Sequence, residues 1–173
     1  DKLNDLINTP CSDDPGELRD KILLELAYAT VWKTSQLARI QDVTLNEVGL
    51  LKIKIGTEIK EIPHLGINKD RLKQYKIHLP KLDIRESFWI SMPNKSNDLN
   101  FLRKIIRKQL KPIGLDLKKL REIATQQFQK NGADIRSVQK LRNLKKIHRF
   151  QSLVDTDYEE LRRKFSKSHT RNH

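Results

Sequence analysis

The sequence has few of the features that are typical of secreted or membrane proteins. Its 173 residues include a single cysteine, Cys11, so no internal disulfide can form, and without a CxxC motif or a Cys/His cluster we expect no structural zinc site. The apolar runs are short, such as residues 22–24, and stay far below the ~18 residues of a membrane span. No signal peptide is recognisable. We therefore expect a cytoplasmic protein with no membrane partner, no metal and no cofactor.

Positive charge is abundant, and it is unevenly distributed. Residues 1–100 hold 15 basic and 15 acidic side chains, whereas residues 101–173 hold 20 basic and 7 acidic ones. The whole net charge of +13 therefore lies in the last 73 residues. A basic surface concentrated in one part of a chain favours a polyanionic partner, with nucleic acid first.

The N-terminal half predicts helices around a small sheet. Asp14, Pro15 and Glu17 are typical of a helix start, and apolar residues continue at helical spacing to Tyr28. We expect Thr34-Ser35 to cap a short second helix. Alternating apolar residues from Val48 predict a strand, a turn at residues 56–57 and a return strand ending at Pro63.

The remaining sequence predicts further helices. Asn68 is placed to cap one, residues 88–90 suggest a short buried strand or extended segment, and the pattern after residue 95 is helical. Asp116 is placed to cap a helix that stops at residues 131–132, Asp134 another, and a last helix is expected over residues 157–165. The sequence thus predicts an α+β, mainly α-helical fold with a small antiparallel sheet near residues 47–64. We expect one domain over residues 1–165 and a polar tail over residues 166–173.

Three sequence stretches are informative when their order and spacing are considered together. They are residues 18–30 (LRDKILLELAYAT), residues 120–139 with Leu120-Arg121 and NGADIRSVQ, and residues 157–171 ending in Ser168-His169-Thr170-Arg171. In this order and spacing they resemble the catalytic domain of Xer-type tyrosine recombinases and phage integrases. The resemblance implies that domain's fold over nearly the whole chain. By this resemblance we expect the given sequence to correspond to the catalytic domain alone, without the family's separate N-terminal core-binding domain.

The resemblance also implies a chemistry of DNA strand exchange. In this family a tyrosine attacks a DNA phosphodiester and forms a covalent link, two arginines hold the phosphate, and histidine and lysine side chains assist proton transfer. Fixed cations lower the barrier because the transition state carries negative charge on its phosphoryl oxygens. A covalent intermediate divides the transfer into two steps.

The first part of the chain departs from this pattern. Lys33 stands where the family's first arginine follows its Ala-Thr-Gly-Leu turn, which here is residues 29–32. Lysine keeps the charge and loses the bidentate fork. Gln36 replaces a glutamate, and the family's hairpin lysine has two candidates, Lys54 and Lys60, neither of which is in clear register.

The second part departs further. The His-x-x-Arg box retains Arg121, but Lys118 replaces its histidine, and Leu144 stands at the histidine of the Leu-Gly-His turn. Counting on without gaps places Leu153 at the nucleophilic tyrosine. Since leucine cannot attack phosphorus, the resemblance implies a protein that binds double-stranded DNA, without cofactors, and does not cut it. Such a protein would be nucleoid-associated in a prokaryote.

A basic face for DNA follows from the same comparison. We expect it to include nine residues, of which only Arg121 is a catalytic remnant: Lys33, Lys60, Lys118, Lys119, Arg121, Arg142, Lys145, Lys146 and Arg149. Contacts of this kind position a duplex by its phosphates and do not identify its sequence.

Two other functions stay open. Tyr158, five residues beyond Leu153, would have to act as a displaced nucleophile in an active, divergent recombinase. Alternatively, the helix expected over residues 157–165 would support self-association, as the C-terminal segment does in the family, in a protein-interaction module without DNA cleavage.

Overall fold

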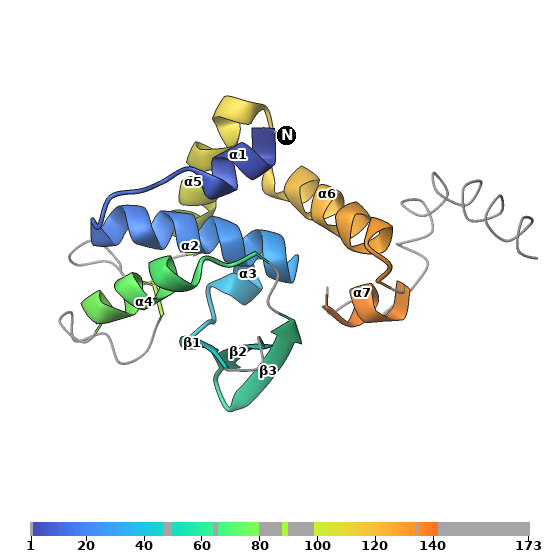
Figure 1. Cartoon of the computed structure of the whole chain (residues 1–173), viewed down its shortest axis with the longest axis horizontal. Helices are drawn as coiled ribbons and strands as arrows, with labels where there is room; N and C mark the ends of the chain where they lie inside the picture. The colour runs from blue at the N-terminus through green and yellow to red at the C-terminus, as the bar shows by residue number, and fades with distance from the viewer. Residues whose placement is uncertain are drawn as a thin grey trace, which may run out of the picture. The chain divides into compact units, whose positions relative to one another are not determined.

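The computed structural model of the chain describes residues 2–46, 50–63, 66–79, 88–89, 99–133 and 135–141 (Figure 1). The chain divides into two compact units, Asp1–Thr125 and Gln126–His173. The described elements of the first unit, in chain order, are α1 (Lys2–Asn8), α2 (Pro15–Thr30), α3 (Thr34–Leu37), β1 (Asp42–Leu45), β2 (Leu50–Ile55), β3 (Glu58–Pro63), α4 (Lys69–His78), α5 (Leu99–Leu110) and the 3₁₀ turn η2 (Lys111–Ile113). The boundary falls within α6 (Leu117–Lys130), and α7 (Ile135–Leu141) lies in the second unit.

Helix α2 is the centre of the first unit. Asp14 caps it by accepting the N–H of Glu17 at 3.0 Å, and Pro15 occupies the first turn, as the sequence predicts. Ten of its 16 residues are buried, and α1, α3, α4 and α5 all pack against it. The apolar stripe from Leu18 onward therefore forms the core of this unit.

Helix α2 ends in a strained turn. Val31 has the left-handed backbone conformation, with φ 54°, and is fully buried. Its N–H donates to the carbonyl of Ala27 at 3.1 Å, and the hydroxyl of Thr30 donates to the carbonyl of Leu26 at 2.7 Å. Left-handed backbone is unusual for a β-branched residue. The turn leads directly into α3 and fixes the position of Lys33.

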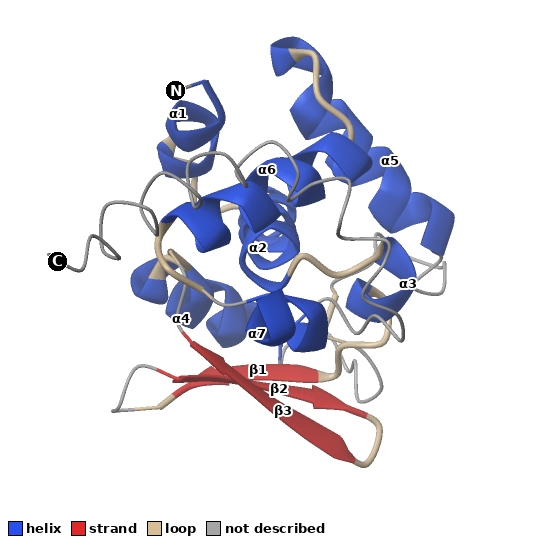
Figure 2. Ribbon diagram, turned by 90° about the vertical axis from the view of Figure 1, so that its right-hand side faces the viewer, coloured by secondary structure: helices blue, strands red, loops and turns tan. Residues whose placement is uncertain are grey.

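The three strands form one antiparallel sheet in the order β1-β2-β3. Figure 2 shows it on one side of the helices of the first unit. The buried side chains of Leu51, Ile53 and Ile62 share one face, because Leu51 pairs with Ile62 and residues two apart on a strand point the same way. The helical architecture with its single small sheet confirms the α+β class.

Three local predictions need correction. Lys33, and not Thr34-Ser35, occupies the cap position of α3, where its N–H donates to Oε1 of Gln36 at 3.0 Å. The sheet starts at residue 42, earlier than predicted, because it includes β1, which the sequence analysis missed. Phe88 and Trp89 are buried, as expected, but they form a bend, with the Trp89 indole donating to the Leu37 carbonyl at 2.6 Å. Residues 47–49 and 90 lie outside the described residues.

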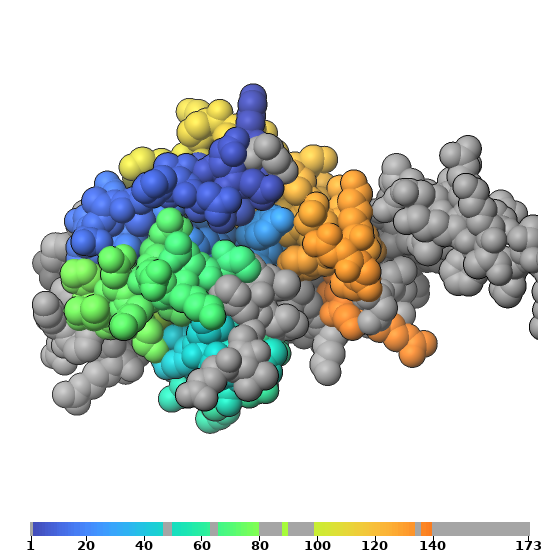
Figure 3. All heavy atoms as spheres, viewed as in Figure 1, coloured from blue at the N-terminus to red at the C-terminus, as the bar shows by residue number. Residues whose placement is uncertain are grey.

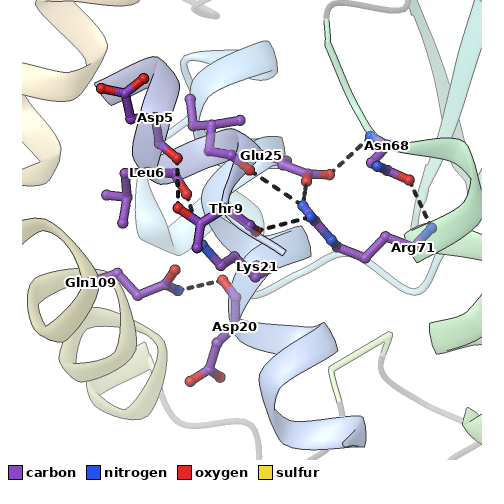
Figure 4. Close-up of polar contacts among 10 residues, drawn as sticks. Asp5, Leu6, Thr9, Asp20, Lys21, Glu25, Asn68, Arg71 and Gln109 are labelled. Carbon is purple, nitrogen blue, oxygen red and sulfur yellow. Dashed lines mark hydrogen bonds and ion pairs between the residues drawn. The ribbon is translucent and has the colours of Figure 1, made fainter. Parts of the chain in front are cut away.

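A polar network ties α1 to α2 and α4, as Figure 4 shows. The buried guanidinium of Arg71 pairs with the carboxylate of Glu25 and donates to the carbonyls of Ile7, at 3.4 Å, and Thr9, at 3.3 Å. Lys21 donates to the carbonyl of Leu6 at 2.7 Å. In the space-filling view α1 and its following loop lie against α4 (Figure 3). Two cations thus satisfy carbonyls at the C-terminal end of α1, which is a favourable end for positive charge.

The described part of the second unit comprises the end of α6 and the helix α7. Gly132 ends α6 with φ 91°, which confirms the predicted stop, and Phe128 and Val138 are buried. Asp134, the last predicted helix and the tail lie outside the described residues. The prediction of one domain over residues 1–165 therefore stays a prediction.

Candidate functional site

A cationic cavity of about 260 Å³ lies between α3, α5 and the start of α6, all within the first unit. Its lining consists of four basic residues, two hydroxyl residues and one leucine: Lys33, Thr34, Ser35, Arg103, Leu117, Lys118 and Arg121. No carboxylate is among these lining residues. The cavity is therefore suited to an anion.

A neighbouring turn or the buried face of its own helix positions each basic residue at the cavity. The left-handed turn at Val31 leads to Lys33. Helix α5 buries Leu102 and Ile106, which leaves Arg103 exposed one position after Leu102. Helix α6 buries Leu120, and Lys118 and Arg121 lie within one turn of it. The Asp116 carboxylate caps α6 by accepting the N–H of Lys119 at 2.7 Å.

Arg121 is the best-fixed cation of the cavity. It is half-buried, and its Nε donates to the backbone carbonyl of Val31 at 2.6 Å. The hydroxyl of Thr125 in turn donates to the Arg121 carbonyl at 2.6 Å. A guanidinium held in this way needs little reordering to meet a phosphate.

A second cavity, of about 250 Å³, adjoins the first. The two share Thr34, Arg103, Leu117 and Lys118, and the second adds Ile106, Arg107 and Asp116. Because four lining residues are common to both, the two cavities are neighbours, and we call them together the basic groove. Five basic residues line the basic groove: Lys33, Arg103, Arg107, Lys118 and Arg121.

The structure brings together three of the residues predicted to face DNA and separates two others. Lys33, Lys118 and Arg121 line the basic groove. Lys119 does not, and its Nζ lies 3.7 Å from the Glu122 carboxylate. Lys60 lies on β3 with its Nζ 5.7 Å from the centroid of the Trp32 ring, a cation–π contact.

The other predicted positions lie outside the described residues. These are the basic residues Arg142, Lys145, Lys146 and Arg149, the degenerate positions Leu144 and Leu153, and the alternative nucleophile Tyr158. Their roles stay predictions.

Sequence analysis missed Arg103, Arg107, Thr34 and Ser35 as groove residues. Arg103 and Arg107 are four apart and lie outside the apolar stripe of α5, which places them on one helix face. That spacing was visible in the sequence. The sequence did not show that this face of α5 lies next to the start of α6.

Two classes of site receive no support from the described residues. None of the helices described is long and apolar enough to cross a membrane. Within the same residues, no group of three or more His, Cys, Asp or Glu side chains is placed to hold a metal ion.

No family model matches the chain. A stretch of 62 residues, 35% of this chain, is 39% identical to tyrosine recombinase XerD of Proteus mirabilis and covers 19% of that protein. The crystal structure of XerA recombinase matches 99% of this chain with a TM-score of 0.66 and 16% identity.

These comparisons confirm that the chain has a tyrosine-recombinase-like fold. The chain spans only 64% of the XerA recombinase chain and a smaller share of XerD. The likeness thus assigns the architecture of this protein.

Proposed function

We propose that this protein binds double-stranded DNA through the basic groove and does not cleave the strand. The observation that carries the proposal is the lining of the 260 Å³ cavity, where four cations meet without a carboxylate. Concentrated, fixed positive charge on a concave surface attracts the phosphate backbone of a duplex.

Arg121 is the principal phosphate ligand in this proposal. Its side chain is anchored on the Val31 carbonyl, and it stands at the arginine of the family's His-x-x-Arg box. Lys33 and Lys118 line the same cavity and add positive charge without bidentate geometry. Contacts of this type give affinity and orientation with little sequence preference.

The absence of cleavage rests on the residues at the family's other catalytic positions. Leu153 has no nucleophilic atom, and Leu144 and Lys118 replace histidines that would transfer protons. General acid–base help is typically worth ~10²–10⁴-fold in rate, and without a nucleophile no covalent intermediate forms. Phosphate binding needs only the cations, so it survives these replacements.

A salt titration of binding to a labelled duplex tests the proposal. The protein is compared with Arg121→Ala and with the double variant Lys118→Ala/Lys119→Ala. We expect binding that weakens steeply with salt, with a log–log slope that falls by ~0.9 for each phosphate contact removed. Both variants should bind more weakly and with a shallower slope.

Lys73→Ala provides the matched control. Lys73 is an exposed lysine of α4 that does not line the basic groove. Its removal lowers the net charge by one, as Arg121→Ala does, so it should change affinity less than Arg121→Ala. Absent or salt-insensitive binding by the unaltered protein would overturn the proposal. Light scattering with and without DNA would then test self-association.

A further inference from the structure

Thr34 holds a buried hydroxyl that has no hydrogen-bond partner among the described residues. Only 5% of the residue is exposed. Its carbonyl accepts the N–H of Ala38 at 2.8 Å, but its Oγ1 makes no hydrogen bond in the described part of the chain. Buried hydroxyls are normally satisfied, because leaving one without a partner costs free energy. This exception therefore points to a group that the described residues do not supply.

The unsatisfied hydroxyl is in the wall of the basic groove. Thr34 lines both cavities, and so does Arg103. Arg107, one helical turn further along α5, lines the second cavity but not the first. Thr34, on α3, is thus among the residues that the two cavities share.

We propose that Thr34, Arg103 and Arg107 form a second phosphate subsite beside the one at Arg121. The basic groove would then hold two successive phosphates of one DNA strand. The identity of the ligand rests on the proposed DNA-binding function, whereas the subsite rests on the Thr34 hydroxyl and the two arginines.

An anionic oxygen is the partner that fits this subsite. A threonine hydroxyl can donate one hydrogen bond, and bonds to ionised acceptors are stronger than neutral ones. Asp116 also lines the second cavity. Its carboxylate is engaged as the cap of α6, on the Lys119 N–H, and two guanidinium groups outweigh its charge. A cationic ligand would meet repulsion from Arg103 and Arg107, and an apolar ligand would desolvate these charged groups without pairing them.

The decisive variant is Thr34→Val, which removes the hydroxyl, keeps the shape and leaves the charge unchanged. We expect its thermal unfolding midpoint to be equal to or above that of the unaltered protein, because an unsatisfied buried group is replaced by an apolar one. We expect its affinity for duplex DNA to fall by roughly tenfold, the size of a hydrogen bond to a charged group. Thr34→Ser should retain most of the affinity.

A dinucleotide probe separates the subsite from general DNA binding. Thymidine dinucleotides with and without a 5′-phosphate present two phosphates or one, and their binding is followed by amide shifts in nuclear magnetic resonance. We expect the unaltered protein to prefer the 5′-phosphorylated probe. Thr34→Val and Arg103→Gln should reduce that preference.

The two proposals fail in distinguishable ways. If the unaltered protein binds duplex and Thr34→Val binds as tightly, the subsite is wrong and the proposed function stands. If the protein binds no duplex but prefers the two-phosphate probe in a manner that depends on Thr34, the proposed function is wrong and an anion subsite stands. Equal probe binding by all proteins would overturn the subsite.

Discussion

The Nε of Arg121 donates a 2.6 Å hydrogen bond to the carbonyl of Val31, the one described non-glycine residue with a left-handed backbone. The bond joins the start of α6 to the turn that ends α2, across 90 residues of sequence. The direction of the Val31 carbonyl depends on the backbone of this turn. A strained residue thereby helps to position the main cation of the basic groove.

Glycine at position 31 should be more stable than alanine at the same position. Both substitutions lose the buried valine methyls, but only glycine adopts φ 54° without a steric penalty. We expect Val31→Gly to exceed Val31→Ala by about 1 kcal/mol in free energy of unfolding. Denaturant titration measures both.

Val43 provides the matched control for this difference. It is equally buried, but it lies in β1 with ordinary backbone. There glycine should be less stable than alanine by ~0.5–1 kcal/mol. The same order of alanine and glycine at both positions would contradict the strain at Val31.

Adjacent lysines should contribute unequally to DNA binding. Lys118 lines both cavities of the basic groove, whereas Lys119 pairs with Glu122 outside it. Lys118→Gln and Lys119→Gln remove the same charge, so their long-range effects on association are equal. We expect Lys118→Gln to raise the dissociation constant more, as measured by fluorescence anisotropy at fixed salt. Equal losses would place the duplex on a broader surface than the groove.

Removing Arg71 should destabilise the first unit severely. Its partner Glu25 has a side chain that is 1% exposed, and an unpaired buried charge costs ~3–5 kcal/mol. We expect Arg71→Met to show this loss in denaturant unfolding. Replacing both partners, as Glu25→Leu/Arg71→Met, should recover much of it. Amide exchange in α1 should be faster in both variants than in the unaltered protein, because the carbonyls of Ile7 and Thr9 lose their donor.

The Arg71→Met variant should also be more stable in mild acid than at neutral pH. Burial raises the pKa of Glu25 above its ordinary value of 4.5, and Arg71 opposes that shift. Without Arg71 the pKa rises further. Between 4.5 and the raised pKa, the folded state retains a proton that the unfolded state releases, so stability falls as pH rises through this window. Stability that instead rises with pH in this window would contradict the assignment.

The sequence predicted those elements whose signals are local. The start of α2 at Asp14 and the end of α6 at Gly132 depend on capping groups within a few residues. Helix α1 and strand β1 were missed, because each is stabilised by distant partners. Arg71 holds α1 from 64 residues away at the Ile7 carbonyl, and Lys76 donates to the Val43 carbonyl on β1 at 3.0 Å.

The candidate site shows the same division. Arg121, Lys33 and Lys118 were identified through the family pattern, which is a property of the sequence. The role of Thr34 depends on burial and on an absent partner, and neither is visible in a sequence. Capping propensity even suggested a competing role for this residue. The structure assigns the cap position to Lys33, and Thr34 lies in the groove wall.

The protein should form no covalent adduct with DNA. Incubated with nicked duplexes and separated on a denaturing gel, it should migrate as free protein, because Leu153 supplies no nucleophile. Leu153→Tyr alone should leave this result unchanged within the assay, since Lys118 and Leu144 still stand at the proton-transfer histidines. An adduct formed by the unaltered protein and lost in Tyr158→Phe would instead establish a displaced nucleophile. That outcome would contradict the inactive assignment and leave phosphate binding by the basic groove intact, because both functions require the cation at Arg121.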